Sequence, residues 1–260
     1  MSPIARWSAR TAAAVTLCVA VAAAAAGARV QVYPSGPSIP ENLLRIELRL
    51  AAPLDAPLDT AHVKLLDASG RTIDGAFLDV PLPSGDGMRM TLLLHPGRVK
   101  SGVGANLALG RALRMGSPVT LLIDDPALGT PVRKSWQVLA PVVSPVAPSS
   151  WTLTAPSAGA RTPLVVRMHA AIASAAQDLV AVRAPDGTRL AGSASLADFE
   201  TTWRFVPSRS WKPGAYALMV HPELEDPAGN RACASFESVG ASRVDCRNGA
   251  AVSFMVKAGV

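Results

Sequence analysis

The densest group of acidic side chains in the sequence is Glu223, Glu225 and Asp226. Three carboxylates together with the carbonyl oxygens of a turn are a ligand set that suits Ca²⁺. The ligand spacing of an EF-hand loop is absent, however, and Asp226 and Asn230 bracket a short segment whose backbone amides their side chains could bond. The turn is the favoured interpretation, so we predict no metal ligand. Calcium binding by the three acids stays open as the alternative.

The chain lacks the common sequence patterns of enzyme catalysis. It contains no G-x-S-x-G, no H-E-x-x-H, no P-loop and no G-x-G-x-x-G. Its four histidines are isolated in the sequence, and we interpret them as solvated surface residues: His62, His95, His169 and His221. Met88 and Met90 could form a thioether pair for Cu(I), but core methionines on one face of a strand have the same spacing. We therefore predict no enzyme activity, no catalytic residue and no cofactor.

Tryptophan is the side chain most suited to binding a sugar ring. Four tryptophans follow residue 28: Trp136, Trp151, Trp203 and Trp211. Alternation places Trp203 on an apolar strand face, and Trp151 directly follows a Pro-rich segment, which predicts packing at a seam between domains. Trp211 stands in a turn beside Lys212, so we expect it to be the most exposed and name it as a candidate ligand contact. A single exposed aromatic side chain is weak support, since sugar sites usually combine several aromatic and polar groups.

Residues 1–28 have the pattern of a secretory signal. Arg6 and Arg10 provide a positive start, an apolar stretch runs from Thr11 to Ala26, and the small residues at 26–28 fit a cleavage site. No other segment approaches 18 consecutive apolar residues. We expect an exported protein, periplasmic or extracellular, with no membrane span after signal cleavage. Whether the segment is removed or retained as an anchor stays open.

Composition and charge favour a folded protein that does not bind nucleic acid. Apolar residues make up 49% of the chain and charged residues 17%, which is unlike a disordered segment. Loss of residues 1–28 removes two arginines and no acids, so the net charge of +6 becomes +4. The basic residues are scattered, without a run of five and without aromatic residues between them, so we expect no nucleic-acid partner.

Two cysteines remain after the leader, Cys233 and Cys246. An even pair in an oxidising compartment predicts a disulfide, which would pin the segments near the C-terminus. No C-x-x-C occurs, so neither a redox site nor a zinc ribbon is indicated. The alternative is two unpaired thiols buried separately.

Two-residue alternation of apolar and polar side chains is the main secondary-structure signal. Residues 44–50 show it most clearly: leucine and isoleucine fall on one face, and Arg45, Glu47 and Arg49 fall on the other, which we expect to meet water. Similar segments recur at 88–95, 164–169, 202–205, 216–221 and 252–257, with Gly- and Pro-containing turns between them. The pattern predicts an all-β fold of antiparallel strands. Helical signals are weak, at 105–113 and 170–177.

The same order of features appears twice along the chain. A strand, a turn-linked pair of strands, a strand ending in a Pro-Gly turn, a strand, an Asp-Pro-Ala turn and a last strand follow one another in each half. The second copy is expected to end in the segment RACASFES at 231–238. This duplication predicts two domains of about 110 residues, 29–140 and 149–260. Between them lies a linker at 141–148, whose three prolines favour an extended, semi-rigid connector.

Three motifs in the second copy resemble a bacterial immunoglobulin-like domain family. They are W-x-F-x-P at 203–207, P-G-x-Y-x-L-x-V at 213–220 and D-x-A-G-N at 226–230. The first copy departs from the pattern, with G-S-P-V at 116–119, and is assigned through the duplication. The resemblance implies two tandem immunoglobulin-like antiparallel β-sandwiches that serve as spacers, adhesive modules or binding modules, with no catalytic residue.

These observations predict an exported, non-enzymatic binding or structural module of the bacterial cell envelope that acts through protein–protein contacts. One alternative is a carbohydrate- or cell-surface-binding module, and another is a metal-binding periplasmic protein. The expected partner is a cell-envelope protein or a surface glycan.

Overall fold

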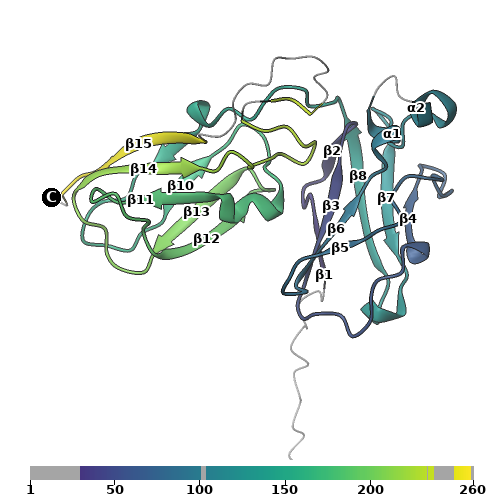
Figure 1. Ribbon diagram of the computed structural model, residues 1–260, viewed down its shortest axis with the longest axis horizontal. Helices are drawn as coiled ribbons and strands as arrows, with labels where there is room; N and C mark the ends of the chain where they lie inside the picture. The colour runs from purple at the N-terminus through teal and green to yellow at the C-terminus, as the bar shows by residue number, and fades with distance from the viewer. Residues whose placement is uncertain (1–29, 101–103, 233, 237–248, 259–260) are drawn as a thin grey trace, which may run out of the picture.

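The computed structural model describes residues 30–100, 104–232, 234–236 and 249–258. Within these residues β-strands dominate, and they form two bodies of stacked sheets joined by a single segment after residue 139 (Figure 1). Cys233 and Cys246, for which we predict a disulfide, and the signal segment 1–28 lie outside the described residues. Among the described residues, no helix is both long enough and apolar enough to cross a membrane.

The first body consists of two four-stranded sheets. One has the strand order β1 (Val30–Tyr33), β3 (Arg45–Leu50), β6 (Arg89–Leu93), β5 (Leu82–Pro83), with antiparallel pairing throughout. The other has the order β2 (Ser38–Pro40), β8 (Val132–Leu139), β7 (Pro118–Ile123), β4 (Val63–Leu66). In this sheet β2 runs parallel to β8, and the remaining pairs are antiparallel.

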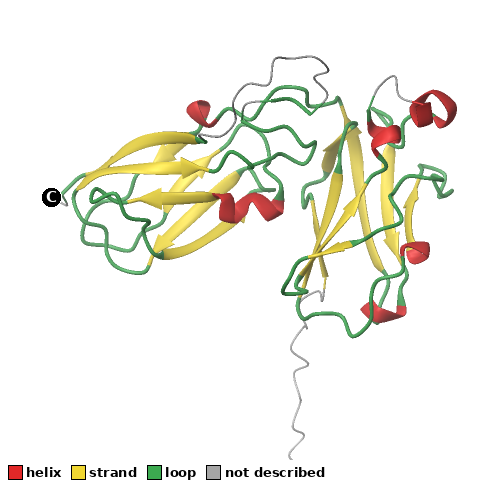
Figure 2. Cartoon of the chain, viewed as in Figure 1, coloured by secondary structure: helices red, strands yellow, loops and turns green. Residues whose placement is uncertain are grey.

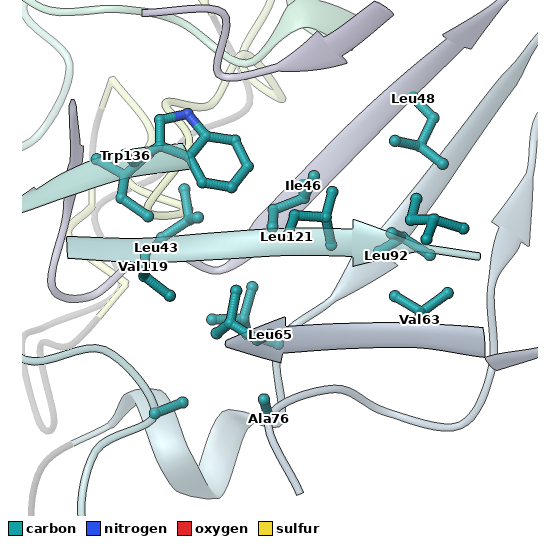
Figure 3. Packing of buried hydrophobic residues seen from close by; sticks show 14 of the residues in the cluster. Leu43, Ile46, Leu48, Val63, Leu65, Ala76, Leu92, Val119, Leu121 and Trp136 are labelled. Carbon is teal, nitrogen blue, oxygen red and sulfur yellow. The ribbon is translucent and has the colours of Figure 1, made fainter. Parts of the chain in front are cut away.

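The two sheets bury their apolar faces against each other. Ile46 and Leu48 of β3 lie between the sheets together with Leu121 of β7 and Trp136 of β8 (Figure 3). In β7 every second side chain is buried, as the alternation in the sequence predicts, and in β3 the apolar residues Ile46, Leu48 and Leu50 follow the same alternation. The Trp136 indole N–H donates to the Pro34 carbonyl oxygen at 2.9 Å, so this large ring is buried without an unpaired donor.

The second body has a four-stranded and a three-stranded sheet, all antiparallel. The first of these has the order β12 (Gly192–Ala197), β13 (Thr202–Pro207), β10 (Leu164–Arg167), β9 (Thr152–Thr154). The other has the order β11 (Val180–Arg183), β14 (Gly214–Val220), β15 (Ala250–Val256). Trp203 is fully buried between the sheets, as its strand position predicts. Trp151 also packs in this core, so the expectation that it lies at the seam between domains is wrong.

Strand order identifies both bodies as immunoglobulin-like β-sandwiches. Lettered A to G along the chain, the strands of the second body form sheets A-B-E-D and C-F-G, the order of a constant-type immunoglobulin domain. The first body has the same order, with β2 as an extra strand beside β8. The fold is therefore all-β with two tandem sandwiches, and the sequence prediction of fold class is confirmed.

Features repeated in the sequence occupy equivalent places in the two sandwiches. Asp67 follows β4 and Asp186 follows β11, and each carboxylate accepts the N–H of the residue two positions later. Asp125 and Asp226 lie after β7 and β14, and each accepts the N–H of an alanine two positions later. These acidic residues hold turns by the same local bond, which is why they recur at the same points.

Among the residues that the structure describes, helical structure is confined to short segments (Figure 2). They are α1 (Pro96–Val99), α2 (Gly104–Leu109) and the 3₁₀ turns η1 (Thr60–His62), η2 (Pro126–Leu128), η3 (Pro148–Ser150) and η4 (Ser174–Leu179). The weak helical signals at 105–113 and 170–177 fall on α2 and η4.

The last strand of the second sandwich lies later than the duplication predicts. We expect it at 231–238, but the strand that pairs with β14 is β15, with Val220 opposite Ala250. The described residues of 231–238 belong to a loop, in which Arg231 makes only an isolated bridge to Glu225. The first sandwich goes from β7 to β8 through a short turn, whereas the second inserts the whole segment 221–249 between β14 and β15.

Candidate functional site: the junction between the sandwiches

Loops at one end of the second sandwich meet the β2–β3 side of the first (Figure 1). Three of these loops take part: the segment before and within η4, the turn between β12 and β13, and the long loop after β14. From the first sandwich come β3 and the residues that lead into it. The loop insertion that breaks the sequence repeat therefore serves to build a contact between domains.

The outward face of β3 is covered rather than solvated. The sequence places Glu47 on the water-facing side of this strand, but Glu47 is only 6% exposed. One of its carboxylate oxygens, Oε2, accepts the Ser174 hydroxyl and the Ala175 N–H, the latter at 2.8 Å. Glu47 thus caps the N-terminal turn of η4 from across the junction. The expectation that this face of β3 meets water is wrong at Glu47, because a second domain packs on it.

A chain of charges runs along the rim of the same contact. Arg45 of β3 pairs with Glu225, which also accepts from Arg231 Nε at 2.8 Å. Arg231 also forms an ion pair with Glu223, with a nearest N–O distance of 2.9 Å. Exposed ion pairs contribute little on their own, but Arg45 and Glu225 are largely shielded from water, which strengthens their attraction.

A strained turn supplies the third contact. Asp198, Phe199 and Glu200, between β12 and β13, all have left-handed backbone angles, with φ of 52°, 57° and 62°. Such angles are unfavourable for residues other than glycine, so the surrounding contacts must hold them. The Glu200 carboxylate accepts the Ser35 hydroxyl at 2.6 Å and the Ser35 N–H at 3.0 Å.

The tip of this turn also fits against Gly36. A Cβ at Gly36 would lie 3.2 Å from the Cβ of Phe199, closer than most carbon contacts in proteins. A side chain at residue 36 would therefore press on the turn between β12 and β13, and Phe199 would have to shift to make room for it.

The segment that links the domains is fixed from both sides. Asn42 of the first sandwich donates to the Val142 carbonyl oxygen at 2.8 Å and accepts the Val142 N–H at 2.9 Å. Asn230 of the second sandwich donates to the same carbonyl oxygen at 2.9 Å. Both asparagines are fully buried. A further main-chain bond joins the domains directly, from the Leu44 N–H to the Pro227 carbonyl oxygen at 2.9 Å.

Asp226 organises the loop that carries these groups. Its Oδ1 accepts the N–H groups of Ala228 and Asn230, and its Oδ2 accepts the Asn230 amide at 2.8 Å. Burial raises the pKa of Asp226, although the hydrogen bonds from Asn230 and Ala228 act in the opposite direction and Glu225 adds to the rise. The prediction that Asp226 and Asn230 hold a turn is confirmed.

The three acids considered as calcium ligands do not converge on one point. Glu223 and Glu225 bind Arg231, and Asp226 binds the backbone of its own turn. Within the described residues, no group of three histidine, cysteine, aspartate or glutamate side chains is arranged to hold a metal ion. The acidic cluster that the sequence shows is thus an ion-pair and turn network of the junction.

Trp211 is buried, and the expectation of exposure is wrong. It is 2% exposed, its indole N–H donates to the Thr162 carbonyl oxygen at 2.8 Å, and its ring packs edge-on against Phe205, Tyr216 and Phe254. The hydroxyl of Tyr216 bonds the Lys212 main chain and closes the same turn. A ring in this position cannot stack on a sugar, so the candidate ligand contact at Trp211 loses its basis.

Comparison with known proteins finds matches among solved structures. No protein-family model and no curated protein matches the chain. Among solved structures, domains 5-6 of the S-layer protein SbsC are 13% identical over 89% of this chain and 97% of that chain, with a TM-score of 0.27. The tandem Ig repeats of Dlar are 12% identical over 78% of this chain and 85% of that chain, with a TM-score of 0.22. A chimeric titin Z1Z2 is 12% identical over 74% of this chain and 88% of that chain, with a TM-score of 0.26.

Proposed function

We propose that this chain is an exported, non-enzymatic binding or structural module of the bacterial cell envelope, in which two sandwiches act as one rigid unit through protein–protein contacts. The observation that carries the proposal is the double clamp on Val142 by Asn42 and Asn230, together with the burial of Glu47. The secretory pattern of residues 1–28 supports export.

Rigidity matters because of what a partner must order when it binds. Two domains on a loose linker sample many relative poses, and a partner that touches both must select one of them. Here the linker backbone is bonded to both domains before any partner arrives. Two surfaces with a fixed separation and angle can therefore be recognised together, which suits a spacer or an adaptor.

The junction is polar, and this makes its geometry specific. Glu47, Glu200, Asn42 and Asn230 are all buried and all bonded across it or to the linker. A displaced pose would leave these groups buried without partners, at a cost of about 1–3 kcal/mol for each. An apolar contact would tolerate sliding much better.

Cross-linking of residues 29–260 in the native cell envelope, read by mass spectrometry, tests the proposal. We expect one near-stoichiometric protein partner with cross-links to both sandwiches, and a clear loss of recovery for the double variant Asn42→Ala/Asn230→Ala, which loosens the linker. Recovery of background proteins alone, or a partner retained equally by the loosened variant, would contradict it.

A further inference from the structure

The first sandwich carries a pocket on the side away from the second sandwich. It measures about 600 Å³ and lies between the turn after β4 and the segment that joins β6 to β7. Figure 1 shows α1, α2 and β4 together on this side. The volume is in the range of sites that hold small molecules or peptide segments, about 300–1,000 Å³. The junction contacts described above come from other residues.

The pocket is rich in arginine. Its wall contains Arg71, Arg98, Arg111 and Arg114, against the two acids Asp67 and Asp74. Two of the arginines have acidic partners: Arg71 pairs with Asp67 at 3.3 Å, and Arg111 pairs with Glu41 at 3.3 Å. Hydrogen bonds from Ser69 and the Arg71 N–H lower the pKa of Asp67 to about 2, so its carboxylate is charged at neutral pH, as an ordinary aspartate is.

Arg98 is a buried cation without a counter-ion among the described residues. It is 6% exposed, its Nε donates to the Gly110 carbonyl oxygen at 2.6 Å, and its Nη1 donates to the Asp74 carbonyl oxygen. Carbonyl dipoles satisfy these donors but carry no full negative charge. Buried charges in proteins are normally paired, so the wall at Arg98 presents an uncompensated positive charge to the pocket.

Arg114 brings a second guanidinium to the same place. Its Nη2 would lie 3.7 Å from a Cβ built on Gly110, the residue whose carbonyl oxygen Arg98 binds. The Arg114 side chain is exposed and makes no hydrogen bond or ion pair within the part of the chain that the structure describes, while its main-chain carbonyl accepts the Ser117 N–H. Two arginines that flank Gly110 form a receptor for a carboxylate, which guanidinium groups bind in a two-pronged manner.

The rest of the pocket is apolar and partly open. Leu109 lines it and is largely exposed, and Leu113, Val119 and Val138 lie deeper in the wall. Because β4 ends at Leu66, opposite Thr120, the first residues of β7 line the pocket without a partner strand on that side. A ligand that suits this surface has an oxyanion for the arginines, an aliphatic group beside it for Leu109, and an extended backbone that can lie along the start of β7.

We propose that this pocket binds an acidic peptide segment of a partner protein, with a carboxylate seated between Arg98 and Arg114 and a neighbouring aliphatic side chain against Leu109. The proposal deepens the binding role given above and rests on it for the choice of a protein partner. Phosphate-bearing small molecules share the oxyanion chemistry and are an outcome of the test.

The test is a titration of ¹⁵N-labelled protein, residues 29–260, with an end-blocked peptide of alternating leucine and glutamate, its glutamine analogue, and inorganic phosphate. We expect the acidic peptide to bind, with amide shifts concentrated at 109–114, Ser117 and Val119, and the glutamine analogue to bind at least about tenfold more weakly. Binding should also weaken as salt is raised.

Two variants distinguish binding in the pocket from a general effect of positive charge on affinity. Arg98 is buried and its loss endangers folding, so the informative change is Arg114→Gln, which we expect to weaken binding by about tenfold or more. Arg133→Gln removes the same charge from an exposed site on β8 and should change affinity less than about twofold. Equal binding of both peptides, shifts outside the pocket, or equal effects of the two variants would overturn the proposal. Pocket shifts with phosphate but not with the peptide would overturn the peptide and indicate a phosphate-bearing ligand.

The outcome is separable from the proposed function. A failed peptide titration leaves the envelope cross-linking and the rigidity of the junction untouched. A loosened junction, in turn, leaves the pocket intact, because every pocket residue belongs to the first sandwich.

Discussion

Asn42 and Asn230, which come from different sandwiches, donate to the same carbonyl oxygen, that of Val142 in the linker. This shared acceptor couples the pose of each domain to the path of the chain between them. Rotation of either sandwich about the linker would break one of these partly buried hydrogen bonds, which favours one relative angle of the pair.

The first prediction concerns the linker clamp. Asn42→Ala removes both bonds to Val142, so the partly buried Val142 N–H loses its partner and the Val142 carbonyl oxygen keeps the bond from Asn230. We therefore expect a loss of about 1–3 kcal/mol in the free energy of unfolding. Gln137→Ala, which deletes an exposed amide on β8, is the matched control and should cost less than about 0.5 kcal/mol. Urea denaturation measures both. Equal stability of the two variants would show that the clamp contributes nothing.

The second prediction concerns the buried acid of β3. Glu47→Ala strips the Ser174 hydroxyl and the Ala175 N–H of their acceptor, so we expect destabilisation by about 1–3 kcal/mol. Asp55→Ala, at an exposed position in the same sandwich, should be nearly neutral. In hydrogen exchange, the amide of Ala175 should lose protection in the Glu47 variant. If its protection were unchanged, Glu47 would not be the group that holds η4.

Alternation in the sequence predicts β3 and its buried face, yet it assigns Glu47 to water. A period of two identifies which side chains share a face of a strand, but it contains no information about a second domain that covers the polar face. The same limit applies to Trp211. A Lys-Pro-Gly turn indicates a surface position, whereas the ring is drawn inward by Phe205, Tyr216 and Phe254, which are distant in sequence.

The displaced last strand has a different cause. The second copy matches the first through the Asp-Pro-Ala turn. In both turns one aspartate, Asp125 or Asp226, accepts the N–H of the alanine two positions later. Beyond the turn the second copy makes a loop that contacts the other domain. The strand that pairs with β14 is the later segment in which Val252, Phe254 and Val256 alternate with other residues. Turn chemistry is local and therefore readable from the sequence, whereas the choice of partner strand depends on contacts across the fold.

The third prediction uses the close fit at Gly36. Gly36→Val places a branched side chain against Phe199 and pushes the strained turn between β12 and β13 away, so the Glu200 bonds to Ser35 should break. Gly85→Val is the control, since a Cβ at Gly85 meets nothing within 4 Å. Small-angle scattering should show a longer or broader envelope for the Gly36 variant alone. Identical scattering from the two variants would show that the turn does not fix the pose.

The fourth prediction is a pH dependence that arises from Asp226. Because burial raises its pKa in the folded state above the ordinary value of 3.8, the native protein binds this proton more tightly than the unfolded chain does. Stability due to this group is therefore greatest at low pH and falls as the pH rises from the ordinary value through the raised pKa.

Comparison with Asp226→Asn isolates that effect. The amide side chain in the variant does not titrate, so the substitution changes the unfolding free energy by an amount that does not depend on pH. The unfolding free energy of the wild type minus that of the variant should therefore fall as the pH rises through this window and stay constant above it. Urea denaturation from about pH 3 to about pH 7 measures the difference. A difference that moves in favour of the wild type as pH rises would show that hydrogen bonds from Asn230 and Ala228 outweigh burial.

The most direct test of a fixed pair of sandwiches is a set of residual dipolar couplings from weakly aligned protein, residues 29–260. If the junction holds as described, one alignment tensor fits the backbone amides of both sandwiches, and Asn42→Ala/Asn230→Ala splits it into two tensors of unequal magnitude. Two unequal tensors in the wild-type protein would show that the domains reorient independently and would contradict the rigid unit.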